Sequence, residues 1–194
     1  MKKGNILLIF FIILLIFSVA MFVLATPGIT GHATSDTTVS EVTITNYLSI
    51  SMSENLGTGI AFGSVSTLPA TDVNATNNYD GGSSASTLSI EVSEDSNTAV
   101  DFCIKADGDL TTSGADTLGL GNETYANATS SDVDTPALAN EVALTESYVK
   151  AGDSVAAGST NYYRFWLDIP AAQTPGTYNN TVYFEGVNTG GACS

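Results

Sequence analysis

Apolar and polar residues alternate with a period of two through much of the chain, most clearly over residues 161–169. The alternation predicts a strand with Tyr163, Phe165, Leu167 and Ile169 on one face and Tyr162, Arg164, Trp166 and Asp168 on the other. Pro170 would end this strand, because proline cannot donate to a ladder. The dipeptide Pro175-Gly176 predicts a tight turn, followed by a second strand over residues 178–187. We expect the remaining strands to pack onto these two.

Similar alternation predicts further strands upstream. Over residues 42–52 the apolar row is Val42, Ile44, Leu48, Ile50 and Met52, which indicates a long half-buried strand. Residues 59–65 predict a second strand flanked by glycines. Residues 88–93 and 100–105 alternate on either side of a polar turn, so we expect them to form a hairpin.

The remaining segments are loops or are ambiguous. Gly, Asp, Asn, Ser and Thr dominate residues 69–86 and 107–136, which predicts two long loops, the second anchored by Leu110, Leu118, Leu120 and Tyr125. Residues 137–150 fit a strand but also two helical turns, and we interpret them as a strand. About seven strands without a good amphipathic helix predict an all-β, antiparallel β-sandwich over residues 38–194, preceded by a linker over 26–37.

Residues 1–25 form an apolar leader with a short basic start at Lys2 and Lys3. This pattern is typical of a secretory signal peptide, and small residues permit cleavage after Ala25 or Ala33. The apolar run, about 20 residues long, is also enough for an uncleaved helical membrane anchor.

A third interpretation of the leader starts from Lys3-Gly4, which resembles the processing site of archaeal type IV pilins. Against it, the segment 26–28 (Thr-Pro-Gly) would break the helix directly after the apolar run. All three interpretations place residues 34–194 outside the membrane, extracellular or at the cell surface. Membrane contact would then involve the N-terminal segment alone.

Charge narrows the range of partners. The chain has 20 acidic and 5 basic residues and a formal net charge of −15. Such a surface repels nucleic-acid phosphates and anionic lipid headgroups, so we expect no nucleic-acid partner. The acidity fits a solvated protein outside the cell.

Cys103 and Cys193 are the only cysteines, and in an exported chain they most simply form one disulfide. Such a bond would close a loop of about 90 residues and stabilise the fold by roughly 4 kcal/mol. A disulfide between subunits is the alternative. Two cysteines and a single histidine argue against a metal site.

Four asparagines match the N-glycosylation acceptor pattern: Asn74, Asn122, Asn127 and Asn179. The first three lie in predicted loops, where an acceptor would be exposed, although unmodified turn asparagines explain the pattern equally well.

Two pairs of aspartates, 107/109 and 132/134, carry the oxygen ligands that Ca²⁺ prefers. Neither has the twelve-residue loop with a distal Glu, so solvated turn carboxylates are the preferred interpretation.

The sequence offers little for catalysis. His32 is the only histidine, and if cleavage follows Ala33 it leaves with the leader, so that no Ser-His-Asp or Cys-His arrangement can then be assembled. Carboxylates are plentiful enough to leave a two-carboxylate glycosidase open, but no acidic pair stands out beside aromatic residues except Asp168 near Trp166. We therefore expect neither an enzyme nor a bound cofactor.

The segment from Ile169-Pro170 to Pro175-Gly176-Thr177-Tyr178 resembles the corner of immunoglobulin-like domains. The resemblance implies that the Tyr178 ring packs on the edge of the core and its hydroxyl bonds back to the corner backbone. With the leader and the Thr/Asn/Ser-rich remainder, the chain also resembles exported archaeal surface proteins. That resemblance implies a place in the cell envelope and assembly with copies of itself.

Three functions are consistent with these features. The first is a structural surface protein that self-assembles into filaments or an envelope layer, with residues 42–52 completing a neighbour's sheet. The second is an adhesin or glycan-binding module that uses loops 66–86 and 107–136. The third is a subunit similar to type IV pilins.

Overall fold

The computed structural model describes residues 11–15, 38–79, 87–129 and 136–194, and the chain divides into two units, residues 1–43 and 44–194. In the first unit, residues 11–15 are helical and residues 38–43 form neither helix nor strand. None of the helices within the described residues has the length and apolar character needed to cross a membrane. Most of the leader, the linker over 26–37 and His32 lie outside the described residues.

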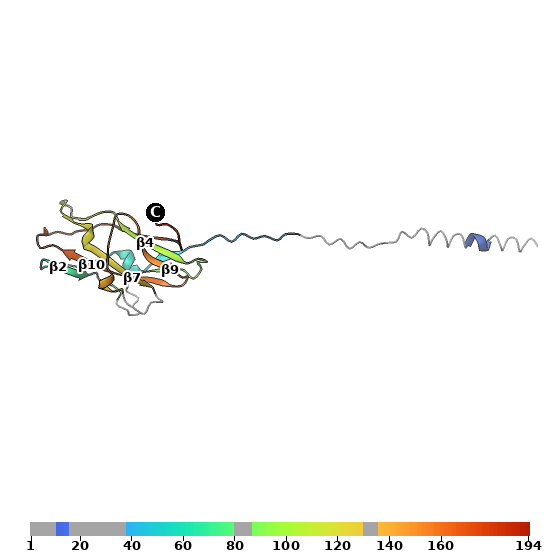
Figure 1. Ribbon diagram of the computed structural model, residues 1–194, viewed down its shortest axis with the longest axis horizontal. Helices are drawn as coiled ribbons and strands as arrows, with labels where there is room; N and C mark the ends of the chain where they lie inside the picture. The colour runs from blue at the N-terminus through green and yellow to red at the C-terminus, as the bar shows by residue number, and fades with distance from the viewer. Residues whose placement is uncertain (1–10, 16–37, 80–86, 130–135) are drawn as a thin grey trace, which may run out of the picture. The chain divides into compact units, whose positions relative to one another are not determined.

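The second unit is an antiparallel β-sandwich, as the sequence predicts (Figure 1). Sheet A consists of β1 (Ile50–Met52), β2 (Ala70–Asn74), β3 (Ser89–Val92), β7 (Glu123–Thr129), β8 (Val142–Ala143) and β10 (Thr160–Ile169). Sheet B consists of β11 (Val182–Asn188), β4 (Val100–Ala106) and β9 (Val149–Val155), in that order. A small hairpin of β5 (Leu110–Thr111) and β6 (Thr117–Leu118) stands apart. Within the described residues there are eleven strands, seven of them with four or more residues.

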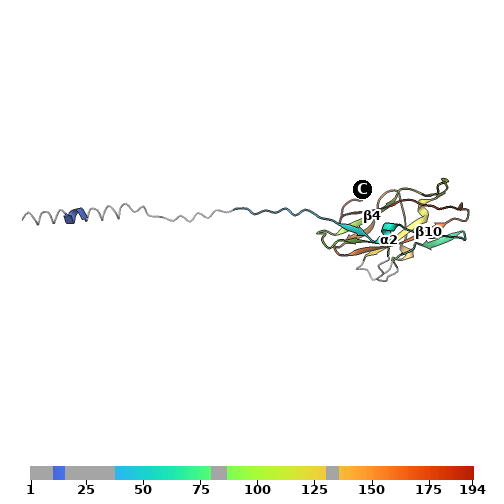
Figure 2. The ribbon, with the colours of Figure 1, turned by 180° about the vertical axis from the view of Figure 1, so that it is seen from behind.

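Three short helices complete the fold: α2 (Glu54–Thr58), η1 (Leu120–Asn122) and η2 (Leu138–Asn140). Helix α2, labelled in Figure 2, begins after Ser53, whose hydroxyl accepts the amide of Leu56. This is an ordinary N-cap, because the cap side chain satisfies a donor that the first turn leaves unpaired.

The core lies between the two sheets. Ile90 of β3, Phe102 of β4 and Phe165 of β10 are fully buried there. Tyr163 of β10 meets Phe184 of β11 edge to face, with ring centroids 5.3 Å apart, so the two layers touch directly. Each such side chain contributes about 2 kcal/mol by leaving water.

Strand β10 is the centre of sheet A. It pairs with β3 and β2 along one side and with β7 along the other. The strand predicted over 161–169 is therefore confirmed. The strand predicted over 178–187 starts later, at Val182, and belongs to sheet B, so the corner between the two strands crosses from one layer to the other.

The predicted hairpin of 88–93 with 100–105 is wrong, although both strands exist as β3 and β4. They lie in different sheets, and residues 93–99 cross between the layers. The crossing segment bonds to an earlier part of the chain: Ser93 N donates to Ser49 O at 2.9 Å, and Asn97 N to Tyr47 O at 3.1 Å. Alternation shows that a strand has one buried face, but not which sheet it joins.

The long strand predicted over 42–52 is shorter in the structure, where only Ile50–Met52 pair as β1. Residues 45–49 are extended and bonded to the crossing segment 93–97 through main-chain and Asn97 side-chain contacts. Leu48 and Ile50 pack against the core, whereas Val42 and Ile44 remain 81% and 79% exposed.

Three other predictions need correction. Residues 59–65 form no strand, although Ile60 and Phe62 pack against the core. The predicted loop 69–86 contains β2, and the predicted loop 107–136 contains β5, β6 and β7. Strand β7 was missed because its sequence, Glu-Thr-Tyr-Ala-Asn-Ala-Thr, is largely polar, with a buried glutamate in an inward position. Residues 137–150 hold η2, β8 and the start of β9.

Candidate functional site

A shallow pocket of about 180 Å³ lies on the outer face of sheet A. Its lining residues come from β1, β3, β10 and the neighbouring turns: Ser51, Met52, Ser53, Thr87, Ser89, Glu91, Thr160 and Tyr162. The pairing register places Ser51 of β1 and Thr160 of β10 on either side of Glu91 of β3. Side chains directly opposite on neighbouring strands stand close together, so this register brings hydroxyls and a carboxylate to one spot.

Tyr162 is the aromatic residue among those that line the pocket. The ring of Tyr162 stacks on Tyr79 with centroids 4.0 Å apart and an interplanar angle of 18°. The Ser53 hydroxyl has a structural role, because it donates to Thr87 O at 2.7 Å and also caps α2. Hydroxyls, one exposed carboxylate and an aromatic face suit binding of a polar, sugar-like ligand.

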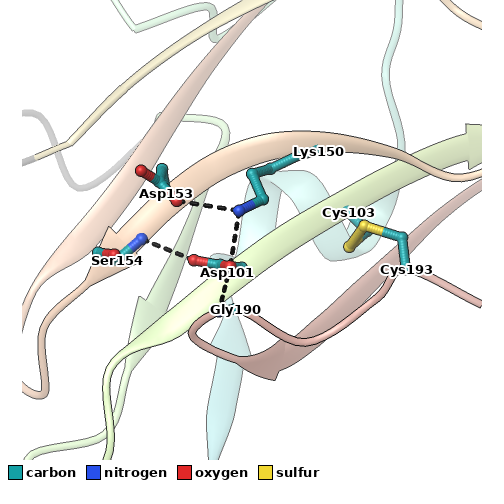
Figure 3. A network of polar contacts seen from close by, with 7 residues as sticks. All are labelled: Asp101, Cys103, Lys150, Asp153, Ser154, Gly190 and Cys193. Atoms are coloured by element: carbon teal, nitrogen blue, oxygen red, sulfur yellow. Dashed lines mark hydrogen bonds and ion pairs between the residues drawn. A yellow bond between two sulfur atoms is a disulfide. The ribbon is translucent and has the colours of Figure 1, made fainter.

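The predicted disulfide is confirmed within the chain. Cys103 on the outer face of β4 is bonded to Cys193, with Cα atoms 5.9 Å apart and a sequence separation of 90. Beside it, Gly190 N donates to Asp101 at 2.9 Å, so the C-terminal tail is bound to β4 at two points (Figure 3). The alternative of an intersubunit disulfide is thereby excluded for this pair.

Asp101 is a fully buried carboxylate at the centre of a small network. It accepts from Lys150 Nζ at 2.7 Å and Ser154 N at 2.8 Å, in addition to Gly190 N (Figure 3). Burial alone would raise its pKa, but hydrogen bonds from Lys150, Ser154 and Gly190 outweigh burial and lower the pKa to about 2. The unfolded chain takes up this proton at higher pH, so the stabilisation is complete above about pH 4 and lost as the pH falls toward 2.

A second buried carboxylate, Glu123 of β7, is held differently. It is 2% exposed and accepts from Asn180 Nδ2 at 2.9 Å. Burial raises its pKa, and the hydrogen bond from Asn180 only partly opposes the effect. The polarity of Glu123 gives no reason to predict its burial. The one signal in the sequence is its spacing of two residues from Tyr125, which is also buried and would share its face of a strand.

Asn161 of β10 is fully buried and links the two sheets. Its amide donates to Ala151 O of β9 at 2.9 Å, and its side-chain oxygen accepts from Asn127 at 3.1 Å. A Cβ at Gly152 would lie 2.8 Å from Asn161 Nδ2, so glycine is what leaves room for this link. The predicted face of residues 161–169 begins at Tyr163, so the sequence predicts neither the burial of Asn161 nor its bridge to β9.

At the corner between β10 and β11, the Tyr178 hydroxyl donates to Thr174 O at 2.7 Å and accepts from Gln173 Nε2 at 2.7 Å. Pro175 and Gly176 are exposed, and a Cβ at Gly176 would lie 2.8 Å from Thr112 Cγ2. The Tyr178 ring packs on a small apolar cluster of Leu110, Leu118 and Leu167.

Trp166 is 2% exposed although it lies on the outer face of sheet A. The Arg164 guanidinium covers its ring at 5.0 Å and is itself bonded to Pro136 O and Asn74 Oδ1. Trp166 is therefore a packing residue within its own domain. The nearby Asp168 carboxylate accepts a hydrogen bond from the Asp72 main-chain amide at 2.8 Å.

The four sequons differ in accessibility. Asn74 and Asn179 are exposed, whereas Asn122 and Asn127 are half-buried with their Nδ2 atoms donating to Gly119 O and Asn161 Oδ1. The prediction that the first three lie in loops is wrong, because they lie in β2, η1 and β7. A glycan requires a free, exposed amide, so Asn74 and Asn179 are the better acceptors.

The Ca²⁺ candidates do not converge on one point. Asp107 accepts Thr181 N at 2.8 Å and Asp109 accepts Leu120 N at 2.7 Å, so both carboxylates brace turns. The bond from Thr181 lowers the pKa of Asp107. Within the described residues, no three carboxylate, imidazole or thiol side chains form a group that could hold a metal ion. Asp132 and Asp134 lie outside the described residues.

Comparison of the chain with protein-family models, with curated proteins and with solved structures found no match. The proposed function therefore depends on this chain's own residues and their geometry.

Proposed function

We propose that this protein is a non-enzymatic structural protein of the cell surface whose copies assemble through the segment of residues 38–44. One observation carries the proposal. The apolar row of the N-terminal segment is used only in part by its own domain: Leu48 and Ile50 pack against the core, while Val42 and Ile44 are left 81% and 79% exposed. An extended segment with an unused apolar row is suited to complete the sheet of another molecule.

Two further features support this proposal. The leader pattern of residues 1–25 favours export, where a disulfide such as Cys103–Cys193 persists. The formal charge of −15 keeps a secreted chain soluble before it assembles.

The test uses the full chain with both Val42 and Ile44 replaced by Asp. The matched control is Val39→Asp, because Val39 is 88% exposed but lies on the opposite face of an extended strand. We expect filaments or layers from the wild type and from the control in the electron microscope and in sedimentation, and single molecules from the double variant. Equal assembly of all three proteins would overturn the proposal. Thermal unfolding checks that the domain itself is unchanged.

A second function, an adhesin or glycan-binding module, is favoured by the pocket on sheet A. Its stacked Tyr162 and hydroxyl-lined floor suit a sugar ring. On a glycan array we expect Tyr162→Ala to abolish any signal, while Tyr183→Ala, an exposed tyrosine of sheet B, leaves it unchanged. An array with no wild-type signal, or one unaffected by Tyr162→Ala, would remove this pocket from consideration.

A further inference from the structure

We propose that the free edge of β11 is the surface to which a neighbouring copy binds. Residues 38–44 of that copy would pair with β11 as an added strand of sheet B. This inference rests on the proposed function and adds to it the surface that receives the segment.

Strand β11 pairs on one side only. Its seven residues pair with β4, and no strand within the described part of the chain lies along its other side. Asp107 N bonds to Thr181 O at 3.0 Å and Thr189 N to Ala99 O at 3.1 Å, both in the register of this pair. In an antiparallel ladder the bonded residues alternate. The odd-numbered residues of β11 therefore bond to β4, and the amides and carbonyls of Val182, Phe184 and Gly186 point to the free side.

The other sheet edges are short or irregular by comparison. Strands β1 and β8 have only three and two residues. Strand β2 contains Asp72 with a positive φ of 54°. Strand β9 has two register shifts against β4 and carries Lys150 and Asp153. Bulges, charges and short length are the usual protections of an edge against pairing.

Strand β11 lacks most of these protections along its length. Its register against β4 shows no shift, and it contains neither proline nor lysine. Its one charged residue, Glu185, is engaged with Ser194 of the C-terminal tail. It is the longest regular open edge in the described residues.

The apolar pattern of the two segments is complementary. On the inner side of β11, Val182 and Phe184 are only partly buried and stand two residues apart. Val42 and Ile44 have the same spacing and would fall on one face of an added strand, where they could continue the core layer. Residues 38–44 also match β11 in length.

A neighbouring copy is the occupant that the exposures favour. Val42 and Ile44 are 81% and 79% exposed, so their apolar row is available to a second molecule. Downstream, residues 45–49 are already held by the turn at 93–97. A second molecule supplies an identical segment without disturbing those contacts.

Hydrogen exchange on the full chain tests the acceptor directly. We expect the amides of residues 182, 184 and 186 to exchange roughly tenfold or more slowly in assembled wild type than in dilute, unassembled wild type. In the Val42→Asp/Ile44→Asp variant they should exchange fast at every concentration, while Val39→Asp behaves as wild type.

The outcomes separate this inference from the proposed function. Assembled wild type without slowed exchange at β11, or with slowing at β9 instead, overturns the inference and leaves the proposed function standing. Slow exchange at β11 in dilute, monomeric protein means that the chain's own segment binds there and also overturns it. Wild type that does not assemble at all contradicts the proposed function itself.

Discussion

Two buried carboxylates respond to burial in opposite ways. Asp101 has three donors, two of them main-chain amides, and is stabilised as an anion. The Glu123 carboxylate accepts a hydrogen bond from the neutral Asn180 amide, and its pKa is raised. Burial penalises both anions, so the number and charge of the hydrogen-bond donors decide whether the carboxylate pKa falls or rises.

We predict that the stability of the Glu123→Gln variant, relative to that of the wild type, increases as the pH rises. In the folded state the Glu123 pKa lies above its unfolded value, so wild type loses stability as the pH climbs from about 4.5 through the folded pKa. Glutamine keeps an oxygen for Asn180 and does not titrate. Urea unfolding of both proteins at pH 4 and pH 7 measures the difference, and an equal difference at the two pH values would contradict the prediction.

Tyr163 gives a second prediction at this scale. Its ring is fully buried in the core, and its hydroxyl has no hydrogen-bond partner among the residues that the structure describes. An unsatisfied buried hydroxyl costs about 1–3 kcal/mol, so Tyr163→Phe should keep the packing and leave stability unchanged or increase it by about 1 kcal/mol. Denaturant unfolding gives the value. A loss of more than 1 kcal/mol would reveal a partner for this hydroxyl.

Among the elements, the C-terminal tail depends on β4 more than on its own conformation. Residues after β11 form no strand, and the tail is held by the disulfide and by Gly190 N on Asp101. These contacts lie on the outer face of sheet B, away from the apolar core.

Replacing both cysteines by alanine should lower the free energy of unfolding by about 4 kcal/mol, because the disulfide closes a loop of 90 residues in the unfolded chain. We also expect the amides of residues 189–194 to exchange rapidly in this variant while those of β4 stay protected at moderate denaturant. Wild type treated with reductant is the matched comparison. Unchanged stability would show that the tail adds nothing beyond the contacts at Asp101.

Whether the sequence predicts a strand depends on how polar the residues of that strand are. Strands β3, β4 and β10 show clean alternation and were predicted, as were the disulfide and the anchoring leucines of residues 107–136. Strand β7 was missed because Glu123 and Asn127 occupy inward positions. The pocket on sheet A depends on strands brought together from three parts of the chain, and pairing between distant strands is not encoded in any local pattern.

At the scale of the whole molecule, the position at which the leader is cleaved distinguishes secretion, processing similar to that of type IV pilins and membrane anchoring. Mass spectrometry of the mature N-terminus gives one of four results. A start at Thr26 or Thr34 indicates ordinary secretion, a start at Asn5 indicates processing similar to that of type IV pilins, and a start at Met1 indicates an uncleaved anchor.

We expect a start at Thr26 or Thr34, because the sequence Thr26-Pro27-Gly28 predicts a break directly after the apolar run, where a pilin helix would continue. Such a start leaves residues 38–44 near the new terminus and available to a neighbour. A start at Asn5 would instead favour assembly through a core of apolar helices.

The side-chain bridge from Asn161 to Ala151 also affects how the domain would bear load. Apolar contacts between two layers have no preferred direction and permit small slides of one layer over the other. A hydrogen bond with defined geometry does not, so β10 and β9 are fixed in position where Gly152 admits the Asn161 amide. A subunit pulled along a chain of its copies would resist shear at this buried point first.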